Sequence, residues 1–205
     1  MKAVLLLSGG FDSPVAGYLM QKKGFEIMAV HFSGEPFTNK EPEHKSRKIS
    51  NLLKFSEFVV VPFGRHLAEI AKKCTHRYYY LLSRRTMLRV AEKIAEKEKC
   101  RYIITGENIG QVGSQTLSNI CTVDKAIGMT ILRPVLCSNK MDTIELAKKI
   151  GTHDISLGPE MCSVLGPKNP ATKSTAEIIE REEKKIDVGL IVEESLLSMK
   201  YEKIQ

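Results

Sequence analysis

Short apolar runs alternate with longer stretches of helical spacing along most of this chain. The runs at residues 3–7, 26–32, 58–61, 101–105 and 130–135 have the length of buried strands. Stretches typical of helices lie between and after them, at residues 14–22, 44–53, 67–73, 80–98 and 142–150. Strands that alternate with helices indicate a parallel sheet covered on both faces. The pattern therefore predicts an α/β fold: a doubly wound parallel sheet of about five strands.

The pattern changes after residue 150. Residues 152–173 are irregular and rich in glycine and proline, and a charged helix is expected at residues 174–184. A length of 205 residues suits one globular domain. We therefore assign residues 1–186 to one domain. Residues 187–205 are expected to form a helical tail that either packs back on the domain or makes a dimer contact.

The first strand runs into a glycine-rich turn, SGGFDS at residues 8–13. Gly9 and Gly10 permit backbone angles and close approaches that a side chain would forbid. Ser13 is expected to cap the following helix, with Pro14 at its first position. A helix that begins behind such a turn presents backbone N–H groups that attract a phosphate. The turn lacks a terminal Gly-Lys-Ser/Thr, so it has no built-in lysine to reach the outer phosphates of a nucleotide.

Asp12 places a carboxylate in this turn, where a bare anion site would not favour one. A Mg²⁺ ion that bridges Asp12 and a pyrophosphate would resolve the conflict. The alternative is a turn that only caps a helix and binds no ligand.

The composition is that of an ordinary globular protein, with 42% hydrophobic and 27% charged residues. No apolar run approaches the ~20 residues of a membrane span, so no membrane partner is expected and the default location is cytoplasmic. The formal net charge is +7. Such a charge fits a polyanionic partner such as RNA, although a solvated lysine face would give the same value.

The five cysteines are scattered, at residues 74, 100, 121, 137 and 162. No CxxC pair occurs, so the spacing indicates neither a zinc ribbon nor a disulfide framework. An iron–sulfur cluster held by three distant cysteines stays open as an alternative, because its ligands need only be close in space.

The turn at residues 8–13 resembles the PP-loop of the ATP pyrophosphatases, which cleave ATP between the α- and β-phosphates. A second block, TGENIGQVGSQTL at residues 105–117, is similar to the catalytic domain of the tRNA 4-thiouridine synthetase family, which is also linked to thiamine thiazole biosynthesis. Further similar pieces follow in the family's order: residues 30–32, 84–87, 132–135, and Cys162 with residues 167–173.

The resemblance implies an adenine nucleotide alpha hydrolase-like fold and an ATP- and Mg²⁺-dependent tRNA sulfurtransferase. Such an enzyme adenylates a uridine carbonyl, releases pyrophosphate, and then transfers sulfur to form 4-thiouridine. Asp12 and Cys162 would be catalytic, with Asp12 as a Mg²⁺ ligand and Cys162 as the carrier of the sulfur. The residues that would bind ATP are Leu6, Leu7, Ser8, Gly9, Gly10, Asp12, Ser13, His31, Phe32, Arg84, Gly106 and Gln115.

Several of these residues also allow a structural interpretation. His31 could close the core, and Arg84 could belong to a solvated basic helix face. Glu107 could bind a metal or a ribose hydroxyl, or only cap a helix. Outside the family context Gln115 would be taken for a surface glutamine.

The chain begins at the strand of the turn, so the family's RNA-binding and rhodanese domains are expected to be missing. The tRNA would then be held by the domain's own basic surface or by an RNA-binding partner protein. Sulfur would come from a separate donor, a persulfide protein or sulfide. Two alternative functions remain at this point: ATP-dependent sulfur transfer or amidation on a small molecule, and a catalytically silent ATP-binding subunit.

Overall fold

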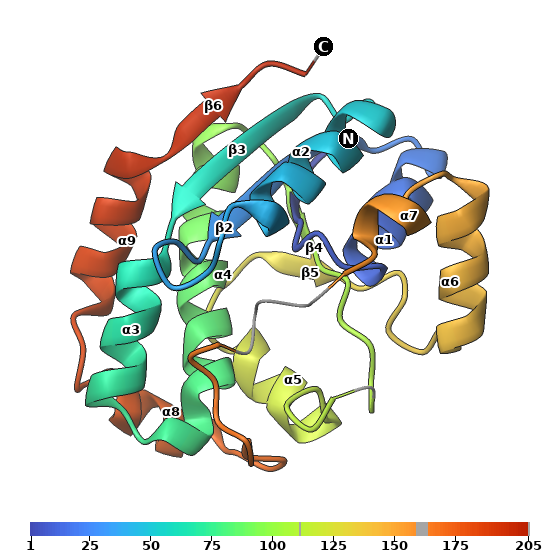
Figure 1. The fold of residues 1–205 in the computed structure, drawn as a ribbon. Helices are drawn as coiled ribbons and strands as arrows, with labels where there is room; N and C mark the ends of the chain where they lie inside the picture. Colours follow the sequence, from blue (N-terminus) through green and yellow to red (C-terminus); the bar gives the residue numbers. More distant parts are fainter. Residues whose placement is uncertain (111, 159–163, 205) are drawn as a thin grey trace.

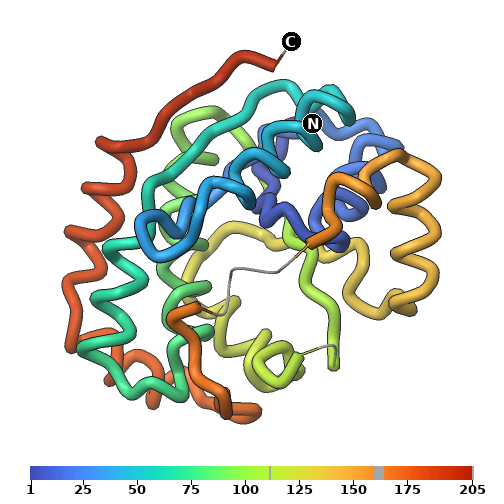
Figure 2. Tube along the Cα trace, in the orientation of Figure 1, coloured from blue at the N-terminus to red at the C-terminus, as the bar shows by residue number. Residues whose placement is uncertain are grey.

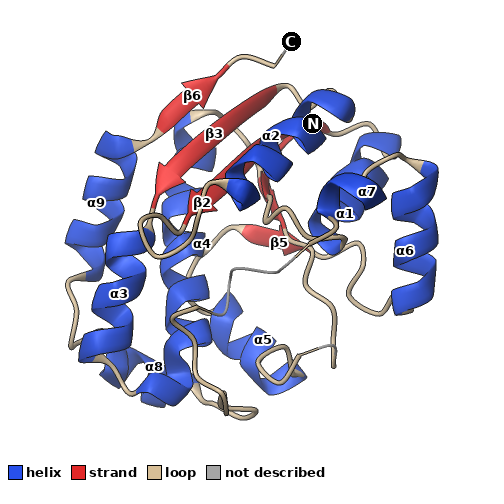
Figure 3. Ribbon diagram, in the orientation of Figure 1, coloured by secondary structure: helices blue, strands red, loops and turns tan. Residues whose placement is uncertain are grey.

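The computed structural model describes residues 1–110, 112–158 and 164–204, and its centre is a six-stranded sheet (Figure 3). The strand order in space is β5-β4-β1-β2-β3-β6. The first five strands pair in parallel, and β6 pairs antiparallel with β3. The strands are β1 (Lys2–Leu6), β2 (Glu26–Ser33), β3 (Glu57–Pro62), β4 (Tyr102–Ile104), β5 (Thr130–Leu132) and β6 (Lys200–Glu202).

Helices cover both faces of the sheet, as the alternating pattern predicted (Figure 1). Helices α1, α2 and α6 lie on one side, whereas α3, α4, α8 and α9 lie on the other. The helices are α1 (Asp12–Lys22), α2 (Glu41–Leu52), α3 (Gly64–Lys73), the 3-10 helix η1 (His76–Tyr78), α4 (Tyr79–Lys97), α5 (Leu117–Asp124), α6 (Lys140–Lys149), α7 (His153–Ser156), α8 (Ala176–Glu183) and α9 (Val188–Ser198).

The central strands are buried on both faces because successive side chains of a strand point to opposite sides. In β1, Val4 joins the apolar cluster that includes α4, whereas Leu5 joins the cluster that includes α1 and α2. Val30 and Ala29 of β2 divide between the same two clusters. This double burial explains why these strands read as continuous apolar runs in the sequence.

The sixth strand goes beyond the predicted set of about five. Residues 187–205 were expected to form a helical tail; α9 accounts for the first part, and β6 then adds to the free edge of β3. Tyr201 faces Val59 across this pair, and α9 contacts both α4 and β3. The short, charged β6 has no alternating apolar pattern that would predict a strand. It is extended because it pairs with the edge that β3 would otherwise leave unpaired.

Two helix starts differ from the sequence prediction. Helix α1 begins at Asp12 with Phe11 at the capping position, and Ser13 does not cap it. The Ser13 hydroxyl instead accepts a hydrogen bond from the Ser8 backbone N–H. Helix α6 begins at Lys140 rather than at the Asp142 capping box, because the Asn139 side chain accepts a hydrogen bond from the Met141 N–H. The cap of α6 is thus a different side chain from the expected one, whereas the N-cap of α1 makes no side-chain hydrogen bond.

Other boundaries shift by a few residues. The short helix α5 begins at Leu117 with Thr116 as its cap. Strand β5 is shorter than the apolar run at residues 130–135. The stretch expected to be irregular contains the one-turn helix α7.

The amino ends of the parallel strands and the end of the chain lie on the same side of the molecule (Figure 2), because β6 runs back along β3. The carboxyl ends point the other way, and a parallel sheet binds its ligands at that edge. Among the described residues, no helix combines the length and the apolar character that crossing a bilayer requires.

Candidate functional site

The glycine turn lies at the carboxyl end of β1, where the order of the strands reverses. Strand β1 has β2 on one side and β4 on the other, which makes this end the switch point of the sheet. Gly9 has a φ of +81°, a conformation that residues with a side chain rarely adopt. The Ser8 N–H donates to Ser13 Oγ over 3.1 Å, and the two hydroxyl oxygens lie 3.2 Å apart. The two serines thus hold the turn closed at its base.

Gly106 brings the end of β4 directly against this turn. A Cβ atom added at Gly106 would lie 2.5 Å from the Ser13 backbone N and 2.7 Å from the Ser13 Cα. No side chain fits there without moving one of the two backbones. Gly106 and Ser13, which the sequence analysis placed in one site, are therefore in contact.

His31 reaches the same strand end from β2. Its Nδ1 lies 2.9 Å from the Leu7 carbonyl oxygen and 3.1 Å from Ser46 Oγ of α2. Burial lowers the pKa of His31, and the hydrogen bond to Leu7 offsets this only in part. A neutral imidazole that donates to the Leu7 carbonyl holds the strand next to the turn, so the side chain closes the core, as the structural alternative predicted. Phe32 packs edge-on against Phe63 at a centroid distance of 5.1 Å.

Arg84 lies beside a buried carboxylate rather than on a solvated face. Arg84 Nη1 is 3.3 Å from Glu107 Oε1, and Arg133 Nε is 2.8 Å from Glu107 Oε2. Thr105 donates to the same Oε2, and Arg133 also pairs with Asp124. Burial raises the pKa of Glu107, but the two guanidinium groups and the hydrogen bonds outweigh it and leave the pKa below its ordinary value. Glu107 is thus an ionised anchor that orients Arg84.

Gln115 shapes its own loop. Its amide oxygen accepts a hydrogen bond from the Asn108 backbone N–H over 2.8 Å, and the Asn108 side chain donates to the Ser138 carbonyl over 2.7 Å. The loop between β4 and α5 is therefore tied to the segment after β5.

Asp12 is the first residue of α1, at the edge of the turn. The described residues contain no group of three or more His, Cys, Asp or Glu side chains placed to hold a metal. Mg²⁺ is usually held by one or two carboxylates, substrate phosphates and waters rather than by a protein cage. A single carboxylate beside the glycine turn fits that mode of binding.

Cys162 lies outside the described residues. Among the described cysteines, Cys74 and Cys100 are buried, and burial raises the pKa of each thiol to about 11. Thiols with such a pKa are poor nucleophiles near neutral pH. Cys121 and Cys137 are exposed.

Three residues that contact the glycine turn were not predicted from the sequence. Ser156 of α7 donates to the Gly10 carbonyl over 3.2 Å, and Lys45 and Ser46 of α2 lie against Gly9. None of them has a local signal, because each comes from an element far along the chain. Arg133 did have one, since it directly follows β5 in a piece already noted as similar to the family.

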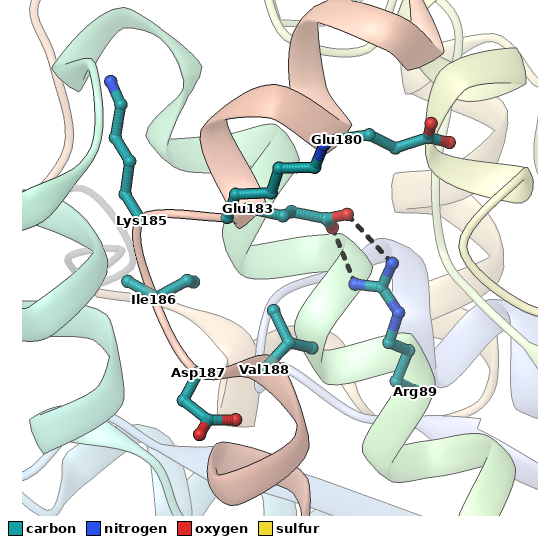
Figure 4. Close-up of a pocket in the computed structure, with 8 residues that line it drawn as sticks. Arg89, Glu180, Glu183, Lys185, Ile186, Asp187 and Val188 are labelled. Carbon is teal, nitrogen blue, oxygen red and sulfur yellow. Dashed lines mark hydrogen bonds and ion pairs between the residues drawn. The ribbon is translucent and has the colours of Figure 1, made fainter.

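A hollow between α4 and the end of α8 is lined by both acidic and basic side chains (Figure 4). Arg89 donates to both carboxylate oxygens of Glu183 there, over 2.6 and 3.0 Å. Glu180 and Asp187 add further carboxylates to its lining. Lys184 and Lys185 also line this hollow, but none of its lining residues belongs to the glycine turn or to the carboxyl end of a strand, so the glycine turn remains the candidate site.

A parallel sheet with a glycine turn at its switch point defines a doubly wound α/β protein, a class that binds its ligands at this edge of the sheet. The NMN synthetase of Francisella tularensis shares this fold, with a TM-score of 0.60 over 96% of this chain and 82% of that one, at 15% identity. The family model described as "Thiamine biosynthesis protein (ThiI)" matches residues 1–188, and the chain belongs to this family.

Two relatives are much more similar. A probable tRNA sulfurtransferase of Brevibacillus brevis is 38% identical over 99% of this chain. The crystal structure of a 4-thiouridine synthetase–RNA complex with bound ATP is 40% identical and has a TM-score of 0.95 over the whole chain. This chain spans only 52% of the length of the first relative and 55% of the second.

Proposed function

We propose that this chain is the ATP-using domain of a tRNA thiolation enzyme. The observation that carries the proposal is the contact between Gly106 and Ser13, which brings two strand ends together at the switch point of the sheet. Membership in the ThiI family and the ATP and RNA in the similar synthetase structure support the choice of substrates.

In the proposed reaction, a uridine carbonyl oxygen attacks the α-phosphorus of ATP. The bond to the β-phosphate oxygen breaks, and pyrophosphate leaves. Adenylation of the uridine oxygen replaces a poor leaving group, hydroxide, with a good one, AMP. The Cys162 thiolate would take the outer sulfur of a donor protein's persulfide, and the donor would leave as a thiol. The terminal sulfur of the Cys162 persulfide then attacks the activated carbon, and AMP departs. A second thiol cleaves the S–S bond, so the cycle ends in a disulfide that an external thiol must reduce.

The pyrophosphate part of ATP would lie on the backbone N–H groups of the turn at residues 8–13, at the positive end of α1. The adenine would meet backbone groups of Leu6, Leu7, His31 and Phe32 at the ends of β1 and β2. Arg84, whose side chain is 27% exposed, would pair with phosphate oxygens while Glu107 holds it in place. Asp12 would hold Mg²⁺, which neutralises charge on the departing pyrophosphate.

Exposed cations lie on the segment after Cys162. Lys168 and Lys173 are exposed there, and this segment rests on η1 through a hydrogen bond from the Ala171 N–H to the Arg77 carbonyl. Arg77 is exposed as well. Such a surface fits the phosphate backbone of a tRNA, with or without an RNA-binding partner protein, and the sulfur would come from a separate donor.

The Asp12→Asn variant is expected to lose pyrophosphate release from ATP by about a hundredfold or more, since a positioned charge at the reacting phosphates is lost. The assay measures pyrophosphate with and without unmodified tRNA. Asp142→Asn makes the same change in the first turn of α6 and should behave as wild type. Unchanged release in Asp12→Asn would contradict the assignment.

The same assay separates the proposed function from its alternatives. ATP binding without turnover on any RNA would favour a silent subunit, and turnover on a small molecule alone would favour a different acceptor. Either result would overturn tRNA thiolation as the function of this chain.

The Cys162→Ala variant is expected to keep pyrophosphate release and to lose sulfur transfer, because adenylation needs no thiol. Mass spectrometry of tRNA nucleosides would measure 4-thiouridine, with the exposed Cys121→Ala as the matched control. If Cys162→Ala still thiolates tRNA at the wild-type rate, the role of this cysteine is wrong.

A further inference from the structure

We propose that Lys45 of α2 binds the outer phosphates of ATP and so supplies the cation that the glycine turn lacks. This inference rests on the proposed function, since it names a further residue of the same ATP site. The turn at residues 8–13 contains no lysine or arginine. Any side-chain cation at the terminal phosphates must therefore come from another element.

The stem of Lys45 packs directly on the turn. A Cβ atom added at Gly9 would lie 3.3 Å from the Cβ of Lys45 and 3.1 Å from the Pro42 carbonyl oxygen. Helix α2 thus approaches the backbone of the turn so closely that a side chain at Gly9 would displace its neighbours by a few tenths of an ångström, in addition to the strain of its φ of +81°. The position of Lys45 relative to the turn is set by backbone packing rather than by a flexible side chain.

The ammonium group of Lys45 stays at this edge of the sheet. Its Nζ would lie 3.0 Å from a Cβ atom added at Gly158, in the segment that follows α7. That segment also reaches the turn, since Ser156 donates to the Gly10 carbonyl. Lys45 is therefore enclosed between the turn and the α7 segment, and its side chain is only 12% exposed.

The partner of Lys45 in the structure is weak. Its Nζ lies 3.4 Å from Glu41 Oε1, and the Glu41 side chain is 45% exposed. Because the Glu41 carboxylate is nearly half exposed, water competes for this long ion pair, which therefore contributes little free energy. Phosphate oxygens carry more charge and would form shorter, charge-assisted hydrogen bonds, so an ATP tail would displace Glu41.

Arg84 is less suited to the same task. It already lies beside Glu107, which follows β4, whereas Lys45 approaches the turn from α2 on the other face of the sheet. The two cations would hold different parts of the nucleotide: Arg84 on the β4 side, and Lys45 against the turn.

The test compares the affinities of three nucleotides. The dissociation constants of ATP, ADP and AMP are measured by calorimetry in the presence of Mg²⁺ for the wild type and Lys45→Met, which keeps the apolar stem. We expect ATP binding to weaken about tenfold or more, ADP binding to weaken less, and AMP binding to change less than about twofold. Lys45→Arg should retain most of the ATP affinity because it keeps the charge.

Lys48→Met is the matched control, because Lys48 is on the same helix and is exposed. Equal losses for ATP and AMP would mean that Lys45 only props the turn, and would overturn the inference. Unchanged ATP binding in Lys45→Met would also overturn it while leaving the proposed function intact. A wild type that binds no ATP would overturn both.

Discussion

A Gly106→Ala variant is expected to lose at least about a hundredfold in ATP affinity, the largest effect of any single methyl group in this site. The added carbon would lie 2.5 Å from Ser13 N, 2.7 Å from Ser13 Cα and 2.8 Å from the Asp12 carbonyl carbon. All three are backbone atoms of the turn, so no side chain can move aside to relieve the clash. Displacement of a binding group by about 1 Å is enough for losses of that size.

The measurement is the ATP dissociation constant together with the melting temperature. Gly113→Ala is the matched control, because it lies in the loop that follows β4 and a Cβ there makes only ordinary contacts, 3.5 Å from Pro170. We expect Gly113→Ala to bind ATP as the wild type does. If Gly106→Ala also binds ATP normally, the contact between the two strand ends has no part in nucleotide binding.

The second large effect concerns stability, in the network around Glu183. Arg85 is 1% exposed and donates to both oxygens of Glu183 and to the Thr122 carbonyl. Arg89 donates to the same carboxylate. These pairs join α4 to α8, and Arg89 and Glu183 also line the hollow of Figure 4. One carboxylate thus compensates a fully buried guanidinium.

Glu183→Gln is expected to lower the free energy of unfolding by about 3 kcal/mol or more, because it leaves the buried Arg85 charge without its partner. Urea unfolding measures this loss. Glu180→Gln is the control: Glu180 is 54% exposed and lies 3.8 Å from Arg85, so its loss should cost less than about 1 kcal/mol. Equal stabilities for Glu183→Gln and Glu180→Gln would contradict the role of the network.

The pH dependence of this loss follows from the pKa of Glu183. Burial raises that pKa, but hydrogen bonds from Arg85 and Arg89 outweigh burial and leave it below the ordinary value. A carboxyl with a lowered pKa stabilises the fold above its unfolded pKa, and the contribution disappears as the pH falls through the folded pKa. The difference in the free energy of unfolding between wild type and Glu183→Gln should therefore be largest near neutral pH and should decrease below about pH 4.3.

The local patterns of the chain were enough to predict the parallel sheet, its helices and the glycine turn. Apolar runs such as residues 3–7 indicate a central strand that is buried on both faces, and a glycine at position 9 permits the positive φ of the turn. These features depend on neighbours within a few residues, so they can be predicted from local sequence patterns. Family membership followed from the same local blocks, since the motif at residues 105–117 is contiguous.

The order of the elements in space decided the rest. Strand β6 exists because β3 has a free edge, and Ser13 bonds Ser8 rather than capping α1 because the turn folds back on itself. Glu107 became an anchor for Arg84, and Lys45 came to lie against Gly9, through contacts between segments far apart in the chain. Periodicity and turn chemistry describe one segment at a time, whereas such contacts depend on how the sheet brings distant segments together. The sequence by itself therefore determined the fold class and the position of the glycine turn in it, and the tertiary structure alone decided which side chains surround that turn.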